Sequence, residues 1–407
     1  MKFTFRALRN RRFSALLFGQ TLSRIGDFLF QIALAWWVLE KTGSATAMGT
    51  VLFFSTLPMV LFVLIGGVVV DRMPRGLLLF ISDTARCFIM LVGAWLAYTD
   101  QLVLWQIYII AILFGFADAF FMPAYNALIQ QIVAEDDLSS ANSINSLSMQ
   151  FGRVAGPAIG GLIVGFGGTA TAFGFNALSF FIGALTVTAL LNIPAPAREG
   201  EPGFTLDQLK QDLRDGFGAI FSSQILWVGI LVSAFMNVTL AGPYSIAMPF
   251  LVQQKLGGDE KMLGFIYAIF PIGYAIASLG MGSLKKIRRR GLLFYISGAI
   301  AGIGLGVFGF GLPLPILVFA ALMNGAALEI TALVWMNLMQ EMVPPEKMGR
   351  VFSMDALGSF VLLPIGFAFT GWLIDRVGVT IVFIAAGGFT AVVSLLPLLH
   401  PAIRRMD

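Results

Sequence analysis

A few ionisable side chains lie inside long apolar stretches of the sequence, where they could bind and release a proton. Asp27, Asp118 and Glu329 are the acidic residues of this kind, and Arg24 and Arg153 are the basic ones. Burial disfavours the ionised form of a carboxyl group, whereas a neighbouring arginine favours it. A carboxyl group that exchanges between such surroundings could carry a proton, and Asp27 is the first candidate. The alternative is a static ion pair or hydrogen bond that holds helices together.

Spacing along the chain suggests how these charges are arranged. Arg24 and Asp27 are three residues apart, on one face of a helix, and are expected to pair. Arg153 is a candidate modulator of the acidic groups. Asp83 and Arg86 lie near the predicted cytoplasmic end of their apolar stretch and are interpreted as structural.

The composition restricts the elements that can position these charges. The chain has 407 residues, of which 58% are hydrophobic and 12% charged, and its mean hydropathy is +0.87. Soluble domains carry about a quarter charged residues, so a soluble globular enzyme and a disordered protein are both excluded. Only helices and closed barrels satisfy their backbone in lipid, and the long apolar runs differ from the short alternating segments of a barrel. The sequence therefore predicts an all-α polytopic membrane protein.

Twelve stretches are long enough to cross a bilayer, which requires about 20 apolar residues. They cover approximately 13–39, 45–70, 76–98, 103–124, 140–166, 170–192, 224–252, 261–284, 291–311, 314–339, 349–373 and 378–399. The even number places both termini on one side. With the N-terminus inside, 19 Lys and Arg residues fall in cytoplasmic segments, and only Lys41, Lys255, Lys261 and Arg376 fall outside. This asymmetry predicts cytoplasmic termini, and it explains the basic clusters without a nucleic-acid partner.

The chain divides near its middle into two halves of six spans. Residues 1–192 form the first predicted bundle, 193–222 a cytoplasmic linker with a short amphipathic helix, and 223–407 the second bundle. Asp118 precedes Asn126 by eight residues in the fourth span, as Glu329 precedes Asn337 in the tenth. Corresponding intramembrane carboxylates indicate a two-fold-repeat transporter with its substrate site between the halves.

The loop after the second span resembles the loop signature of the major facilitator superfamily. The matching residues are Gly67, Asp71, Arg72 and Arg75. The resemblance implies a cytoplasmic latch between the halves, for which Asp355 in the eleventh span is a candidate partner. The alternative is an ordinary turn on the positively charged side of the membrane.

The fifth span resembles the antiporter signature of the same superfamily. The matching residues are Gly152, Gly156, Pro157, Gly160 and Gly161. Small residues four apart let helices approach closely, and generic helix packing is the alternative reading. In the family this pattern accompanies exporters, so the resemblance implies export.

A wider resemblance, carried by residues 22–27, Asp83, Arg86 and residues 349–352, is to the branch that contains macrolide efflux pumps and the enterobactin exporter. It implies the major facilitator fold, a monomer in a bacterial-type inner membrane, and alternating access. The implied function is secondary active export of amphipathic organic compounds, such as drugs, macrolides or siderophores, by proton antiport with no cofactor. Lysophospholipid flippases share the Gly-Asp of the first span, so a lipid-handling carrier is the alternative. Drug–proton antiporters also carry an arginine in the fourth span, and the aligned position here is Phe114.

Aromatic and amide side chains in the spans that should border a central cavity are candidates for substrate contact. They are Phe120, Tyr125, Phe235, Asn237, Tyr244 and Trp335. An enzyme and a metal centre are not expected, because the chain has one cysteine, Cys87, and one histidine, His400, at the far C-terminus. No phosphate-binding loop is present, so the chain itself is not expected to hydrolyse ATP.

Overall fold

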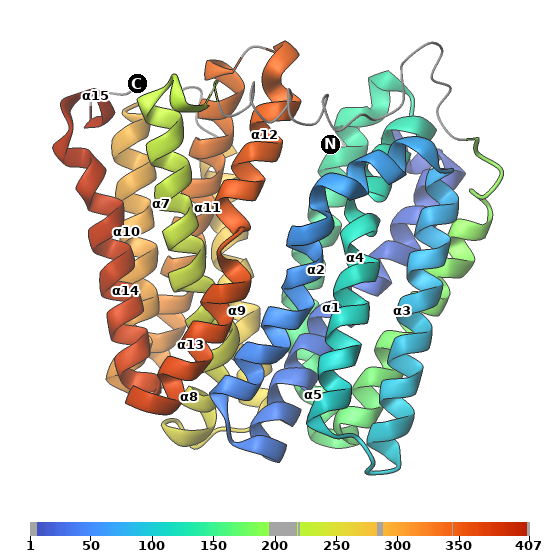
Figure 1. Ribbon diagram of the computed structural model, residues 1–407, viewed down its shortest axis with the longest axis horizontal. Coiled ribbons are helices and arrows are strands. Elements are labelled where there is room, and N and C mark those ends of the chain that lie inside the picture. Colours follow the sequence, from blue (N-terminus) through green and yellow to red (C-terminus); the bar gives the residue numbers. More distant parts are fainter. Residues whose placement is uncertain (1–5, 195–217, 219, 283–287, 344, 405–407) are drawn as a thin grey trace. The chain divides into compact units, whose positions relative to one another are not determined.

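The computed structural model describes residues 6–194, 218, 220–282, 288–343 and 345–404, without the side chains of 63–68, 71–72, 345–350, 353 and 402. Helices make up the secondary structure throughout these residues, and no strand occurs in them (Figure 1). The predicted amphipathic helix of the linker falls largely outside the described residues.

Five long helices build most of the first part of the chain. They are α1 (Arg11–Thr42), α2 (Ala45–Arg72), α3 (Arg75–Tyr98), α4 (Leu104–Ile132) and α5 (Leu138–Thr188). The side chain of Asn10 caps α1 by accepting hydrogen bonds from the backbone of Arg12 and Phe13, and Gly43 ends it at φ 59°. Helix α5 packs against both α1 and α3, and α3 also packs against α4.

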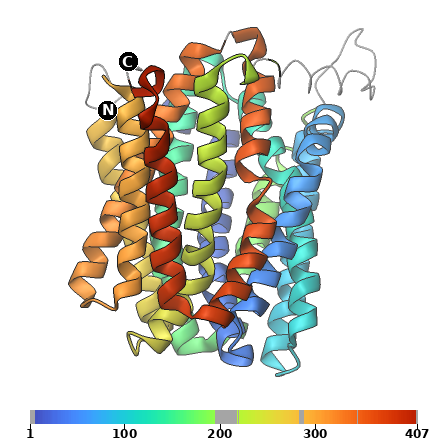
Figure 2. The same cartoon turned by 60° about the vertical axis from the view of Figure 1, so that its left-hand side comes forward.

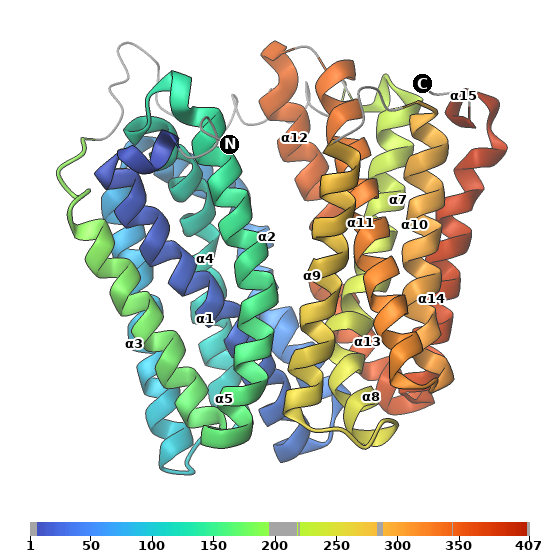
Figure 3. The same ribbon diagram turned by 180° about the vertical axis from the view of Figure 1, so that it is seen from behind.

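Helix α5 contains the fifth and sixth predicted spans. Its 51 residues are interrupted at Gly168, which has φ 72° and ψ −179°. Glycine has no Cβ and adopts this backbone conformation without strain, so the chain can turn here between two apolar arms. Figure 3 shows the two arms meeting at the lower end of α5.

The second part of the chain is again helical. Its longer elements are α7 (Gln224–Gly242), α8 (Met248–Gln254), α9 (Glu260–Gly282), α10 (Arg290–Gly306), α11 (Leu314–Met342), α12 (Pro345–Phe360), α13 (Leu363–Val377) and α14 (Val379–Leu395). A π-helical turn at Pro243–Ala247 joins α7 to α8. Helix α14 packs against α7 and α10 (Figure 2).

The described residues contain eleven helices that are long and apolar enough to cross a membrane. One of them, Glu135–Thr188, covers two predicted spans, which accounts for the difference from twelve. The prediction of an all-α polytopic membrane protein is therefore confirmed.

Contacts divide the chain into two compact units. The first unit contains residues 1–43, 50–201 and 258–268, and the second contains residues 44–49, 202–257 and 269–407. The start of α2 thus groups with the second unit and the first part of α9 with the first, and the predicted bundle boundaries stay a prediction.

Candidate functional site

A buried ion pair lies in the first unit, on two adjacent turns of α3. Arg86 Nη2 donates to Asp83 Oδ1 over 2.7 Å, and Gln20 Nε2 of α1 donates to Asp83 Oδ2 over 2.8 Å. The side chains of Arg86 and Asp83 are 2% and 0% exposed. A buried ion pair is stable only when its geometry is good and its remaining polar atoms form hydrogen bonds. The amide of Gln20 provides such a hydrogen bond for the second carboxylate oxygen of Asp83.

Aromatic rings surround the guanidinium of Arg86. Its central carbon lies 4.1 Å from the ring centroid of Phe121, 4.6 Å from that of Phe180 and 5.9 Å from that of Phe114. Its Nε is buried and has no hydrogen-bond partner among the described residues. Guanidinium groups stack favourably on the faces of aromatic rings. The rings of Phe121 and Phe180 therefore stabilise the Arg86 guanidinium, whose Nε forms no hydrogen bond with the described residues.

Asp118 on α4 makes a second, weaker contact with the same arginine. Arg86 Nη1 lies 3.4 Å from Asp118 Oδ1, and the Asp118 side chain is 41% exposed. Asp118 is thus the accessible carboxylate on Arg86, whereas Asp83 is enclosed.

Asp27 on α1 is the third carboxyl group near this arginine. It is close enough to Arg86, Asp118 and Asp83 to interact electrostatically with each. Its Oδ1 is buried and has no hydrogen-bond partner of normal geometry among the described residues, and the same is true of the neighbouring Asn176 Nδ2. Two carboxyl groups therefore contact the Arg86 guanidinium, and the carboxyl group of Asp27 lies near it. Asp27, Asp83, Arg86 and Asp118 are called the carboxylate cluster below.

The predicted pairing of Arg24 with Asp27 is wrong. Arg24 Nη2 donates to Asn145 Oδ1 over 2.7 Å, and its Nη1 donates to Ser148 Oγ over 2.9 Å. Both acceptors lie on the first arm of α5. The spacing within α1 places Arg24 and Asp27 on one face, but the long arginine side chain reaches the polar groups of the neighbouring helix instead.

Tyr125, a predicted cavity residue, is enclosed in this structure, and its contact with substrate stays a prediction. Tyr125 is 0% exposed, and its hydroxyl donates to Asn145 Oδ1 over 2.8 Å. It belongs to the polar network of Arg24, because its ring centroid lies 5.1 Å from the Arg24 guanidinium carbon.

The other predicted cavity residues make contacts within their own units. Phe120 packs against Phe62 and Phe116, Phe235 against Phe389, and Tyr244 against Phe270. Asn237 Nδ2 donates to the carbonyl of Ser359 over 3.0 Å, and Trp335 Nε1 donates to Asp355 Oδ1 over 3.1 Å. Their contact with substrate stays a prediction.

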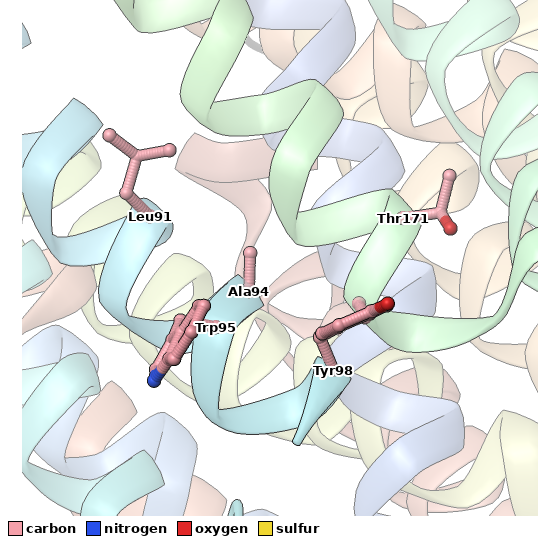
Figure 4. Close-up of a pocket in the computed structure, with 6 residues that line it drawn as sticks. Leu91, Ala94, Trp95, Tyr98 and Thr171 are labelled. Carbon is pink, nitrogen blue, oxygen red and sulfur yellow. The ribbon is translucent and has the colours of Figure 1, made fainter. Parts of the chain in front are cut away.

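An open groove of about 340 Å³ lies elsewhere, between α3 and the second arm of α5 (Figure 4). Its lining residues are Leu91, Ala94, Trp95, Tyr98, Ala170 and Thr171. Trp95 and Tyr98 are largely exposed and stand near the end of α3, as is usual for aromatic residues at the membrane–water interface. The groove therefore fits a lipid-facing surface better than a substrate site.

Most of the residues of the predicted cytoplasmic latch have side chains that the structure does not describe. Nothing is described for the side chains of Gly67, Asp71 and Arg72. Arg75 Nη1 donates to the carbonyl of Ala127 over 2.8 Å within the first unit. Asp355 accepts from Trp335 and, at 3.4 Å, from Ser359 within the second, so the latch stays a prediction.

The glycines of the fifth-span motif stand where neighbouring helices come closest. A Cβ at Gly160 would lie 3.0 Å from Leu29 Cα of α1, and one at Gly161 would lie 2.6 Å from the carbonyl oxygen of Glu260 in α9. Real Cβ atoms rarely approach other atoms so closely, so these positions need glycine. The motif thus builds close helix crossings within the first unit, and its link to export stays a prediction.

Asp83 and Arg86, interpreted from the sequence as structural, lie at the centre of the carboxylate cluster. Phe114 stands at the aligned fourth-span position, and the guanidinium of Arg86 on α3 lies 5.9 Å from its ring centroid. A signal was present in the sequence: residues 75–82 (RGLLLFIS) and 290–297 (RGLLFYIS) are identical at six of eight positions. Directly after this repeat the first copy has Asp83 and Arg86, whereas the second has Gly298 and Ala301.

Two bundles of long apolar helices with buried intramembrane charges define a polytopic membrane transporter rather than an enzyme. Residues 3–406 match the family described as transmembrane secretion effector. The chain belongs to this family of the major facilitator superfamily, which confirms the resemblance drawn from the motifs.

Relatives and solved structures agree with this assignment. The chain is 25% identical over 401 residues to macrolide efflux protein A of Streptococcus pyogenes, covering 97% of each chain. It is 26% identical over 364 residues to the enterobactin exporter EntS of Shigella flexneri, covering 87% of this chain and 85% of the relative. The fold is similar to that of the nucleoside transporter NupG, with a TM-score of 0.77, 14% identity, and coverage of 97% and 100%. It is also similar to a bacterial homologue of the iron transporter ferroportin, with a TM-score of 0.74, 17% identity, and coverage of 95% and 98%.

Proposed function

We propose that this protein exports amphipathic organic compounds across a bacterial inner membrane in exchange for protons. The two relatives named above are by their names an efflux protein for macrolides and an exporter of enterobactin. Both substrates are organic molecules far larger than an ion, and the glycine motif of the fifth span fits an exporter. Drug-like, macrolide-like or siderophore-like compounds are therefore the substrates to test.

The carboxylate cluster is the observation that carries proton coupling. Asp83 and Asp118 contact Arg86, Asp27 lies near it, and one oxygen of Asp27 is buried without a hydrogen-bond partner among the described residues. An unpaired ionised carboxylate in an apolar interior is costly, whereas its protonated form is much less so. Charges held inside a membrane domain commonly mark ion pathways. In this proposal Asp27 holds the transported proton in the described conformation.

Asp118 gives the cluster a route to water. It is the member with substantial exposure, and it contacts Arg86 only at 3.4 Å. A proton could pass between Asp27 and the aqueous phase by way of Asp118 while Asp83 keeps Arg86 in place. Glu329 on α11 and Arg153 on α5 are half-buried, and they remain candidate participants.

Alternating access completes the proposal. The 19 basic residues assigned to one side favour cytoplasmic termini, so protons would enter down their gradient while substrate leaves. A monomer is sufficient, because a two-fold-repeat transporter has its substrate site between its own halves. Asp71, Arg72 and Asp355 would form the cytoplasmic latch in the outward-facing state.

A two-stage experiment tests the proposed function. A growth screen of an efflux-deficient bacterium across macrolides, dyes and siderophores first selects a substrate. Uptake of that substrate into acid-loaded inverted membrane vesicles is then measured with and without an uncoupler. We expect uptake that collapses with the pH gradient. Unchanged uptake without the gradient, or movement of fluorescent lysophospholipid instead of the soluble compounds, would contradict proton-coupled export.

A further inference from the structure

Two aromatic residues of α4 connect the carboxylate cluster to a second polar network. The rings of Phe121 and Tyr125 are one helical turn apart and stacked, with centroids 5.8 Å apart and planes inclined by 12°. The Arg86 guanidinium lies 4.1 Å from the Phe121 centroid, and the Arg24 guanidinium lies 5.1 Å from the Tyr125 centroid. We call Phe121 and Tyr125 the aromatic bridge.

Each of the two guanidinium groups also forms hydrogen bonds with polar side chains outside the aromatic bridge. Arg86 bonds to Asp83, whereas Arg24 bonds to Asn145 and Ser148 on the first arm of α5. The hydroxyl of Tyr125 donates to the same Asn145 oxygen that accepts from Arg24. The bridge thus joins α3 to the α5 arm that carries the Gly-Pro motif, through contacts that all lie within the first unit.

The position of the Arg86 guanidinium depends on its ring contacts more than it would in an arginine whose nitrogen atoms all form hydrogen bonds. Its Nε is buried without a hydrogen-bond partner among the described residues, and Phe121 is its nearest ring. Without this ring face the guanidinium could shift between Asp83 and Asp118, and its distance from Asp27 would change as well. The place of the cation in turn affects which of these groups binds a proton.

We propose that the aromatic bridge is a positioning element that holds Arg86 on Asp83 and links the carboxylate cluster to the first arm of α5. Its importance for transport rests on the proposed proton coupling. Asn145, Ser148 and Phe180 are neutral neighbours from α5. The ionisable groups at the bridge include Arg24 and Asp27 on α1, Asp83, Arg86 and Cys87 on α3, and Asp118 and Tyr125 itself on α4, and Arg153 lies on the first arm of α5.

A titration of stability tests the proposal without substrate or gradient. The unfolding temperature of the purified full-length protein is measured from pH 5 to pH 9 for the wild type, Phe121→Tyr, Phe121→Leu and Phe121→Met. We expect the last two variants to move the midpoint of the pH dependence by about one pH unit, which corresponds to losing a buried cation–π contact. Phe121→Tyr keeps a ring face and should keep the wild-type midpoint. Phe121→Met introduces a longer and more flexible side chain than leucine, which can fill the space differently, and therefore serves if Phe121→Leu does not fold.

Phe173→Leu is the matched control. Phe173 is also a buried aromatic residue of the first unit, but its ring packs edge-on against Phe30 at 4.9 Å. This variant should lower the unfolding temperature at every pH without moving the midpoint. The proposal is overturned if Phe121→Leu and Phe121→Met leave the midpoint in place, or if Phe173→Leu moves it as far.

The link to α5 has its own variant. Asn145→Ala removes the oxygen that accepts hydrogen bonds from both Arg24 and Tyr125. It should move the midpoint of the pH dependence by less than Phe121→Leu does. An unchanged midpoint would overturn the link between the cluster and α5. Failure of the proposed function would look different, as wild-type uptake that ignores the pH gradient.

Discussion

The two units bury different polar groups at corresponding places in a repeated helix. After the shared RGLL segment, α3 continues with Asp83 and Arg86, whereas α10 continues with Gly298 and Ala301. In the second unit Ser297 and Thr331 share a hydrogen bond of 2.8 Å, and Asn324 Nδ2 donates to the carbonyl of Ala301 over 2.6 Å. One unit therefore holds a buried charge cluster where the other holds neutral hydrogen bonds.

This difference helps to distinguish polar groups that join helices from polar groups that could take part in transport. Neutral hydroxyl and amide pairs can join helices in a membrane domain. Between α10 and α11 they do so in the buried part of the contact, and an ion pair of Arg290 with Glu341 joins the same two helices. Buried charges are costly in the same setting. The first unit has the buried charges where the second unit has neutral groups, and we therefore place the proposed proton coupling in the first unit.

The largest effect is expected from Arg86→Met. This change leaves Asp83 buried without its cation, and breaking a buried pair costs about 3–5 kcal/mol. The free energy of unfolding, measured by denaturant titration in detergent, should fall by that order. The double variant Arg86→Met with Asp83→Asn should recover much of the stability but no gradient-driven uptake. If the double variant transported normally, the cluster would be only structural.

Asp118→Asn and Glu329→Gln compare corresponding positions of the two halves. Asp118 is half-exposed and makes one long contact in the cluster, so its replacement should alter the unfolding temperature little. Gradient-driven uptake should fall about tenfold or more for Asp118→Asn, equivalent to at least 1.4 kcal/mol, and less than about threefold for Glu329→Gln. Equal losses in the two variants would mean that both units carry the coupling.

The smallest effect is expected from Thr331→Val in the second unit. It removes a neutral hydrogen bond with Ser297, worth about 1 kcal/mol. Unfolding should become easier by about this amount, while the pH dependence of uptake stays as in the wild type. A shifted pH profile would show that the neutral network also takes part in proton transfer.

The sequence predicted the helical membrane fold because each span needs an apolar run of fixed length. It did not show that two spans would form one interrupted element, since Gly168 looks like any other glycine until its φ is known. The site was harder to predict. Spacing placed Arg24 beside Asp27, but only the packing of α5 against α1 shows that Asn145 attracts Arg24 instead.

The surroundings of Arg86 could not be predicted from the sequence either. Its partners Asp118, Phe121 and Phe180 come from α4 and the second arm of α5, so no local pattern could bring them together. The aligned position in the fourth span lacked an arginine, yet the guanidinium reaches Phe114 from the neighbouring helix. Comparing the two repeats is the sequence signal that isolates Asp83 and Arg86.

Proton release on substrate addition tests the central claim most directly. Acid-loaded inverted vesicles containing the wild type, Asp27→Asn or Thr331→Val are given the selected substrate, and lumenal pH is followed. We predict that substrate raises the lumenal pH for the wild type and Thr331→Val. Asp27→Asn should fold normally, because a neutral amide suits its buried site, yet release no protons. Wild-type proton release from Asp27→Asn would contradict the account.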